Sequence, residues 1–231
     1  FILLILIFLT MNVFSQQKES LRILYIGDSI TDGNWGGGSS KVSSKRNQTD
    51  LNHIFGSGFM YLCAAHYMGN FPEKNYRFYN RGISGNSLKD LEKRWHTDVL
   101  NINPDVLSIL IGINDVNRSI WDRGGDFDFE NWEQRYRALL DTVLLQNPSV
   151  KLVVCSPFVY ESEKMKQDGN WEIQDKLTRQ CAQVVKNIAT DYDAVFVPFD
   201  ELYDNLLKEY PQVTSTYWLW DGIHPTVAGH R

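Results

Sequence analysis

Short apolar runs alternate with longer amphipathic stretches along most of the chain, and this alternation restricts the fold more than any other feature. Five runs are expected to form strands, at residues 21–26, 76–80, 105–111, 151–155 and 194–198. The stretches between and after them are expected to form helices, at residues 58–68, 87–100, 131–145, 173–190 and 201–209. Because strands that alternate with helices build a parallel sheet covered on both faces, the pattern predicts a doubly wound α/β fold.

Composition fits a single α/β domain and excludes some partners. The chain has 231 residues, of which 43% are hydrophobic, enough to bury one core. Its formal net charge of −5 argues against nucleic acid, because phosphate binding requires a basic face, and more weakly against an anionic membrane. The spacing of Cys63, Cys155 and Cys181 matches neither a zinc site nor a disulfide framework, and Cys155 is expected to be a small buried hydrophobe.

The N-terminal segment is typical of a targeting sequence. Residues 1–9 are almost entirely apolar but too few to span a bilayer, and small residues suited to cleavage precede a polar stretch. We interpret residues 1–16 as a signal peptide, incomplete at its N-terminus; a first buried strand or helix is the alternative. The signal predicts a secreted or periplasmic protein with no stable membrane insertion after cleavage.

A single domain is expected over residues 21–231. The glycine- and serine-rich stretch at residues 36–50 is expected to be a loop rather than a boundary. Pro225 and Thr226 should open a closing helix, but the sequence stops at Arg231. We therefore expect that helix to be missing and an apolar strip on one sheet face to be exposed.

Four blocks of polar residues carry the candidate chemistry. Three of them directly follow the first three predicted strands and contain Ser29, Gly85 and Asn114 in turn; the fourth contains Asp221 and His224. Loops that follow parallel strands open on one edge of a doubly wound sheet, so blocks far apart in sequence are expected to converge there.

The residue types in these blocks suit acyl transfer. A serine hydroxyl is a poor nucleophile and needs a base, which His224 can provide near neutral pH, while Asp221 would fix the imidazole tautomer. The backbone N–H groups of Ser29 and Gly85 and the amide of Asn114 can stabilise an oxyanion. Glycine at position 85 would allow the backbone to approach the substrate closely.

Each block taken alone has an ordinary structural explanation. A serine after Gly-Asp is usually a turn residue, and Asp-x-x-His is more often a capped turn. All four blocks in this order at strand ends are a much rarer coincidence, which favours the catalytic interpretation. Two further groups are expected to be structural: carboxylates that bind loop backbone (Asp28, Asp32 and Asp115), and surface or core histidines (His53, His66, His96 and His230).

Aromatic residues near these blocks bear on the substrate. Asp28, Trp35 and Trp220 are the candidates for substrate contact, and Trp121 and Trp218 also lie close to the blocks in sequence. Aromatic faces pack well against sugars, although packing within the protein is an equally good explanation. Outside residues 1–16, no long apolar stretch suggests a lipase lid, which favours a short acyl group on a glycan.

The four blocks together resemble those of the SGNH, or GDSL-type, hydrolase family over nearly all of residues 21–231, with Ile30 where the family name implies leucine. The resemblance implies a three-layer α/β/α, flavodoxin-like fold with a five-stranded parallel sheet. It also implies Ser29 as nucleophile, Asp221 and His224 as its triad partners, and an oxyanion hole completed by Gly85 and Asn114. Longer strings around Gly85, Asn114 and His224 are similar to bacterial acetylxylan esterases, which need no cofactor or metal and can be homo-oligomers.

We therefore expect a secreted serine esterase that removes acetyl groups from glycans such as acetylated xylan through an acyl-enzyme. The alternatives within enzymes are a general short-chain carboxylesterase and a lysophospholipase-like acylhydrolase. A glycan-binding pseudoenzyme is the alternative of another class, although a binding module has no use for the complete set of five site residues. A metal-dependent deacetylase lacks further ligands at metal-site spacing around Asp221 and His224.

Overall fold

The computed structural model describes residues 20–33 and 55–231. The predicted signal peptide at residues 1–16, the loop at residues 36–50, Trp35 and His53 lie outside these ranges. Among the described helices, none is both long and apolar enough to cross a membrane.

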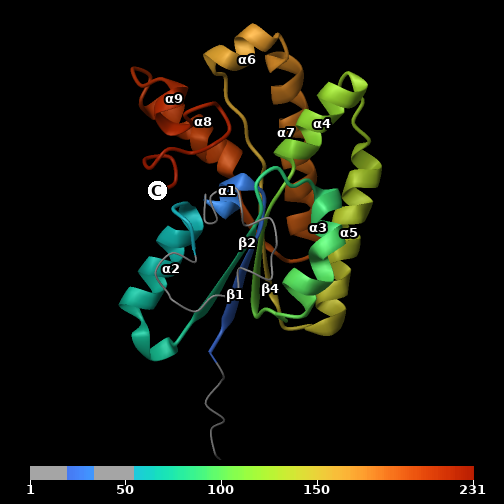
Figure 1. Ribbon diagram of the computed structural model, residues 1–231, viewed down its shortest axis with the longest axis vertical. Helices are drawn as coiled ribbons and strands as arrows, with labels where there is room; N and C mark the ends of the chain where they lie inside the picture. Colours follow the sequence, from blue (N-terminus) through green and yellow to red (C-terminus); the bar gives the residue numbers. More distant parts are fainter. Residues whose placement is uncertain (1–19, 34–54) are drawn as a thin grey trace, which may run out of the picture.

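Five parallel strands form one sheet at the centre of the molecule (Figure 1), as the alternating pattern predicted. The strands are β1 (Arg22–Gly27), β2 (Arg77–Gly82), β3 (Val106–Leu110), β4 (Lys151–Cys155) and β5 (Val195–Val197). Their order is β2-β1-β3-β4-β5, and every neighbouring pair is parallel. This is the flavodoxin-like order, in which the chain changes direction across the sheet between β1 and β3, where such folds place ligands.

Helices cover both faces of the sheet, which gives three layers. On one side lie α3 (Leu88–Trp95), α5 (Phe129–Gln146) and α7 (Trp171–Asp191), and on the other lies α2 (Phe59–Asn70) with α8 (Phe199–Glu209) beyond it (Figure 1). The remaining helical segments are α1 (Ser29–Asp32), η2 (Pro72–Lys74), the π-helical turn η3 (His96–Leu100), α4 (Ile113–Arg123), α6 (Glu163–Asp168) and α9 (Ser215–Trp218).

The main core lies between the sheet and the layer of α3, α5 and α7. Leu24 and Ile26 of β1 pack there with Leu91 of α3, Tyr136 of α5 and Val185 of α7. The apolar side chains of Leu88, Leu91, Trp95 and Val99 recur at helical spacing, and all of them are buried. This rigid layer supports the carboxyl edge of the sheet.

The opposite face is covered less completely. Between α2 and α8 an apolar groove of about 420 Å³ exposes part of the sheet, and Tyr25, Val106, Val153 and Val197 contribute to its lining. The apolar strip expected from the sequence was tied to a missing closing helix, and that expectation stays a prediction. After Pro225 the chain makes a turn, with the N–H of His230 donating to the carbonyl of Thr226 (2.9 Å).

Among the helical segments that the sequence did not predict, α4 bears most directly on the candidate site. The block that contains Asn114 was expected to be a loop after the third strand, but it forms the first turn of α4. Gly112 precedes that helix with φ of 139°, a left-handed value that favours glycine, and allows the chain to turn sharply from β3 into α4. Asn114 is therefore held on a helix rather than on a flexible loop.

Candidate active site

The turn after β1 places Ser29 at the carboxyl edge of the sheet. Gly27 ends the strand, and a β-carbon there would lie 2.3 Å from the carbonyl oxygen of Leu110 on β3, so only glycine fits. Asp28 caps the short helix α1 by accepting a hydrogen bond from the N–H of Ile30 (3.0 Å). Ser29 is the first residue of α1 and is half-buried. It therefore lies at the point between β1 and β3 where the sheet order reverses.

His224 and Asp221 extend from Ser29 in a continuous hydrogen-bonded line. The Oγ of Ser29 lies 2.8 Å from Nε2 of His224, and Nδ1 of His224 lies 2.7 Å from Oδ2 of Asp221. The second oxygen of Asp221 accepts from the backbone N–H groups of Ile223 (3.0 Å) and His224 (2.8 Å). Both carboxylate oxygens are thus engaged, which fixes the orientation of the imidazole.

Backbone pairing closes the loop that carries these two residues. Leu219 and Pro225 form an antiparallel bridge, and the N–H of Trp220 donates to the carbonyl of His224 (3.1 Å). The sequence motif Asp-x-x-His was expected to be either a capped turn or part of a triad. It is a capped turn whose imidazole also reaches the serine.

The electrostatic environment suits a base at position 224. The hydrogen bond that Nδ1 of His224 donates to Asp221 raises the pKa of His224 above its usual value; burial opposes this rise, and the charges of Asp221 and Asp28 add to it. Burial alone would raise the pKa of Asp221, but hydrogen bonds from the His224 side chain and the loop backbone hold it below its usual value. Asp221 is therefore ionised whenever His224 can act.

Asp28 lies beneath the site rather than on its surface. Its side chain is 1% exposed, and burial raises its pKa to about 6. Its bond to the N–H of Ile30 agrees with the structural role expected from the sequence. The tentative role in substrate contact does not fit this location, since a polysaccharide cannot reach so buried a carboxylate. Asp28 instead influences the site through its charge, which favours the protonated form of His224.

Beside the N–H of Ser29, the candidate oxyanion donors come from the start of α4 and from the loop after β2. Asn114, at the start of α4, donates one amide hydrogen from Nδ2 to the carbonyl of Asn86 (3.0 Å), which leaves its second amide hydrogen available. Gly85 precedes Asn86 and has φ of 78°. A β-carbon at Gly85 would meet no atom within 4 Å, so in this structure the backbone conformation, rather than lack of space, accounts for the glycine.

A pocket of about 280 Å³ opens in front of the serine. Ser29, His224, Asp221 and Asn114 share its lining, which confirms that three of the four blocks converge. The lining also contains residues that the sequence analysis did not select, namely Asn117, Ile120, Met165, Asn170, Gln174 and Ile223. Asn117 and Ile120 follow Asn114 at helical spacing, so recognising α4 would have found them. Met165, Asn170 and Gln174 come from a distant region of the chain, and no motif or spacing in the sequence pointed to them.

The tryptophans occupy different positions around this pocket. Trp121 lines it and is 71% exposed, whereas Trp220 is 64% exposed and its ring stacks on His224, with centroids 6.0 Å apart. Trp218 packs against Tyr210 and Tyr217 instead and does not line the pocket. Within the part of the chain that the structure describes, Trp121 is consequently the tryptophan that lines the pocket.

One histidine has a partner that the sequence did not reveal. His230 accepts a hydrogen bond at Nδ1 from the N–H of Phe59 at the start of α2 (3.1 Å), and burial together with the charge of His224 lowers its pKa to about 4. His66 and His96 are exposed, as expected. Among residues 20–33 and 55–231, no three His, Cys, Asp or Glu side chains are grouped so that they could hold a metal ion.

Comparison with known proteins identifies the family to which this geometry belongs. Residues 25–231 match the model of the GDSL-like lipase/acylhydrolase family. The chain belongs to this family. It is accordingly a carboxylic ester hydrolase with the three-layer fold described above.

Several relatives of this GDSL-like acylhydrolase are similar over most of their length. It is 34% identical to an acetylxylan esterase of Geobacillus stearothermophilus over 212 residues, which is 90% of this chain and 88% of the relative. A crystal structure of an acetylxylan esterase from the same organism superposes with a TM-score of 0.74 at 29% identity, covering 91% of this chain and 89% of that one. A crystal structure described as a GDSL-like lipase from Parabacteroides merdae gives a TM-score of 0.77 at 31% identity, covering 91% and 90%.

Proposed function

We propose that this esterase removes acetyl groups from glycans such as acetylated xylan, with Ser29, His224 and Asp221 as its catalytic triad. The observation that carries the proposal is the hydrogen-bonded line from Ser29 through His224 to Asp221 at the mouth of a pocket. A hydroxyl, an imidazole and a carboxylate in that order are the components that acyl transfer requires.

The geometry supports a two-step reaction. Nε2 of His224 takes the hydroxyl proton of Ser29 as Oγ attacks the ester carbonyl carbon, and the oxyanion that forms accepts hydrogen bonds from the N–H groups of Ser29 and Gly85 and from Asn114. The intermediate collapses as His224 returns the proton to the departing sugar oxygen, which leaves Ser29 acylated. In the second step His224 takes a proton from water as the water oxygen attacks the acyl carbon. The new intermediate collapses as His224 returns the proton to Oγ of Ser29, which releases acetic acid and free Ser29.

Variants of the relative support these roles. Structures of the Geobacillus stearothermophilus acetylxylan esterase include forms described as catalytic mutants, in which a serine, an aspartate and a histidine are replaced. The aspartate and the histidine of that enzyme are three positions apart, as Asp221 and His224 are here. The substrate that we propose, acetylated xylan, is taken from this relative, which is described as an acetylxylan esterase.

The pocket favours a short acyl group over a lipid chain. Its volume of about 280 Å³ is at the small end for ligand sites, and the polar side chains of Asn117 and Gln174 form part of its wall. The exposed ring of Trp121 at the mouth offers a face on which a sugar can pack. The proposal also includes secretion, which rests on residues 1–16; a homo-oligomer remains an expectation from the family resemblance.

Ester chain length separates this proposal from its enzymatic rivals. We expect kcat/KM for 4-nitrophenyl esters to be highest with acetate and to fall by at least about tenfold by octanoate, because a pocket of about 280 Å³ leaves little room for the longer acyl chain beside the alcohol. A general carboxylesterase would be nearly indifferent between acetate and butyrate. Preference for octanoate over acetate would indicate a lysophospholipase-like enzyme and contradict the proposal.

The dependence of activity on pH tests His224 as the base. We expect kcat/KM to rise with pH through the pKa of His224, with a midpoint above about 6.5, because the neutral imidazole is the active form and Asp221 raises that pKa. In Asp28→Asn the midpoint should move to lower pH, since removing the negative charge disfavours the imidazolium. A profile that stays flat from acid to neutral pH would contradict His224 as base.

A glycan-binding pseudoenzyme is the remaining alternative. A fluorophosphonate probe should label Ser29 in the folded protein and should fail to label His224→Ala. An absence of adduct on wild-type protein would favour the binding module.

A further inference from the structure

We propose that Arg118 is a positioning residue of the oxyanion hole, which holds the loop at residues 83–87 so that the N–H of Gly85 stays directed at the oxyanion. The inference rests on the proposed function, because it assigns a role in that reaction. Arg118 does not itself touch the substrate; it acts through the loop.

The middle of the loop needs such support, because only the loop's end residues, Ile83 and Ser87, are buried. Ser84 and Gly85 are exposed, and no atom lies within 4 Å of the position that a β-carbon of Gly85 would occupy. A bond from the N–H of Asn86 to the carbonyl of Ile83 (3.1 Å) closes the turn. Gly85 has φ of 78°, and a glycine can take negative φ values equally well, which would turn its N–H away. The direction of this donor therefore depends on polar contacts around the turn.

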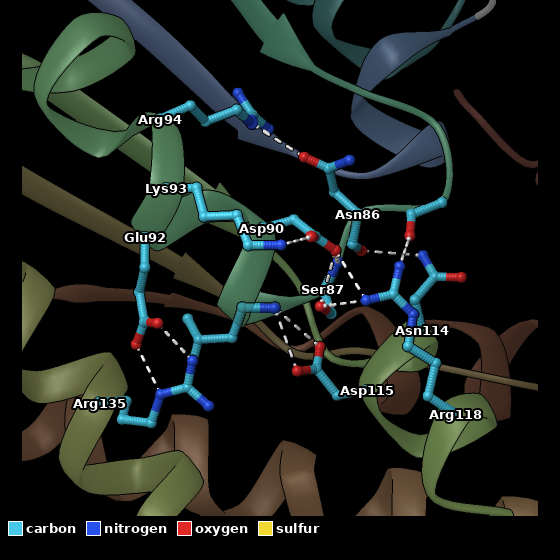
Figure 2. A network of polar contacts seen from close by, with 12 residues as sticks. Asn86, Ser87, Asp90, Glu92, Lys93, Arg94, Asn114, Asp115, Arg118 and Arg135 are labelled. Carbon is cyan, nitrogen blue, oxygen red and sulfur yellow. Dashed lines mark hydrogen bonds and ion pairs between the residues drawn. The ribbon is translucent and has the colours of Figure 1, made fainter. Parts of the chain in front are cut away.

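Arg118 provides those contacts from α4. Its Nη2 donates to the carbonyl of Gly85 (2.8 Å), and its Nη1 donates to Oγ of Ser87 (2.7 Å) and to Oδ2 of Asp90 (2.8 Å). In Figure 2 the guanidinium of Arg118 lies between Ser87 and the loop backbone, and its dashed lines reach both. The planar guanidinium of Arg118 thus links the loop to α3, because it contacts Gly85, Ser87 and Asp90 at once. A lysine, which carries a single ammonium group, cannot reproduce these contacts.

The same helix carries the other side-chain donor of the oxyanion hole. Asn114 lies one turn before Arg118 and binds the carbonyl of Asn86 (3.0 Å), so α4 holds two consecutive carbonyls of the loop. Asp115 adds a third link, because both of its oxygens accept from the N–H of Leu88 (3.1 Å each). The backbone donor at Gly85 and the side-chain donor at Asn114 are therefore fixed relative to each other through one helix.

The anchor of Arg118 on α3 is itself ionised. Burial would raise the pKa of Asp90, but hydrogen bonds from the Ser87 backbone, Lys93 and Arg118 outweigh burial and hold that pKa well below its usual range. Asp90 consequently keeps its negative charge over the pH range in which His224 is active. Arg118 retains a charged partner on one side and the loop carbonyl on the other.

A second arginine holds the loop from below but is less suitable for a test. Arg94 donates to the side chain of Asn86 (2.8 Å) and to the carbonyls of Arg81 (2.8 Å) and Gly27 (3.1 Å), and it pairs with the buried Asp98. Removing it would leave a buried carboxylate poorly compensated, which destabilises the fold. Arg118 is 45% exposed, and its salt-bridge partner Asp90 also pairs with Lys93, so that carboxylate keeps a cation when Arg118 is replaced.

The test compares Arg118→Gln and Arg118→Lys with Arg135→Gln. Arg135 is a matched control because it also pairs with a carboxylate of α3, that of Glu92, and makes no bond to the loop (Figure 2). With 4-nitrophenyl acetate we expect both Arg118 variants to lose roughly 10- to 100-fold in kcat, since a misplaced donor costs less than the loss of a donor. KM should stay within about twofold of wild type, and Arg135→Gln should match wild type in both constants.

A rescue experiment separates positioning from general stability. Millimolar ethylguanidinium should restore part of the lost kcat to Arg118→Ala and should not change the activity of wild type or Arg135→Gln. Arg118 variants with wild-type kcat, or with a raised KM and unchanged kcat, would overturn the inference, as would an absence of rescue. If wild type shows no Ser29-dependent hydrolysis at all, the proposed function fails first and the role of Arg118 fails with it.

Discussion

Ser29→Ala is expected to lower kcat for 4-nitrophenyl acetate by about six orders of magnitude, to the level left by binding and the oxyanion donors alone. The hydroxyl lies 2.8 Å from Nε2 of His224, whereas the carboxylate of Asp221 is held on the other ring nitrogen, so the variant loses the nucleophile that the imidazole activates. The fold should be retained, because losing one half-buried hydrogen bond costs only about 1 kcal/mol. Unchanged far-ultraviolet circular dichroism would verify this.

When residues act as one catalytic unit, the losses of activity caused by replacing each of them do not add. His224→Ala should be about as inactive as Ser29→Ala, and the double variant should be no slower than either single one. If Ser29→Ala kept more than a few per cent of wild-type activity, or if the two losses multiplied, Ser29 and His224 would not form one catalytic unit.

Asp221→Asn is expected to lower kcat by about 10⁴-fold with the structure of the loop preserved. An asparagine can still accept from the N–H groups of Ile223 and His224, but its amide would face Nδ1 of His224 as a donor. Nδ1 would then have to accept, so the proton would move to Nε2, the atom that must take the proton of Ser29. The tautomer, rather than the position of the imidazole, is wrong in this variant.

A matched aspartate provides the control for that prediction. Asp175 pairs with Arg179 on the exposed side of α7 and does not line the pocket, so Asp175→Asn should retain wild-type kcat. A loss of tenfold or less in Asp221→Asn, measured by steady-state kinetics at the pH optimum, would show that Asp221 does not set the tautomer.

The arrangement of the sheet could be predicted because its determinants are local. Four of the strands read as short apolar runs, whereas β2 (Arg77–Gly82) is more polar. β4 (Lys151–Cys155) has the bounds that the pattern gave. Because the carboxyl ends of parallel strands meet at one edge, the positions of Ser29 and Asn114 after β1 and β3 were enough to predict that they meet.

Features that depend on tertiary contacts could not be predicted in this way. The first turn of α4 is rich in Asn and Asp, which favour turns in isolation, and it is helical because it packs beside α7. The side chain of Asp28 is buried by elements that pack over it in the folded protein. Neither the sequence around Asp28 nor its charge suggested this burial. The bonds from Arg118 to residues about thirty positions earlier likewise exist only once β2, α3 and α4 are in place.

The most direct test of the proposed activity is the release of acetate from acetylated xylan oligosaccharides by wild type and by Ser29→Ala. We predict rapid release by wild type and none above background by the variant, which would establish the nucleophile and the substrate class together. If wild type released no acetate from xylan while it cleaved 4-nitrophenyl acetate in a Ser29-dependent reaction, the esterase would stand and acetylated xylan would be wrong as its substrate.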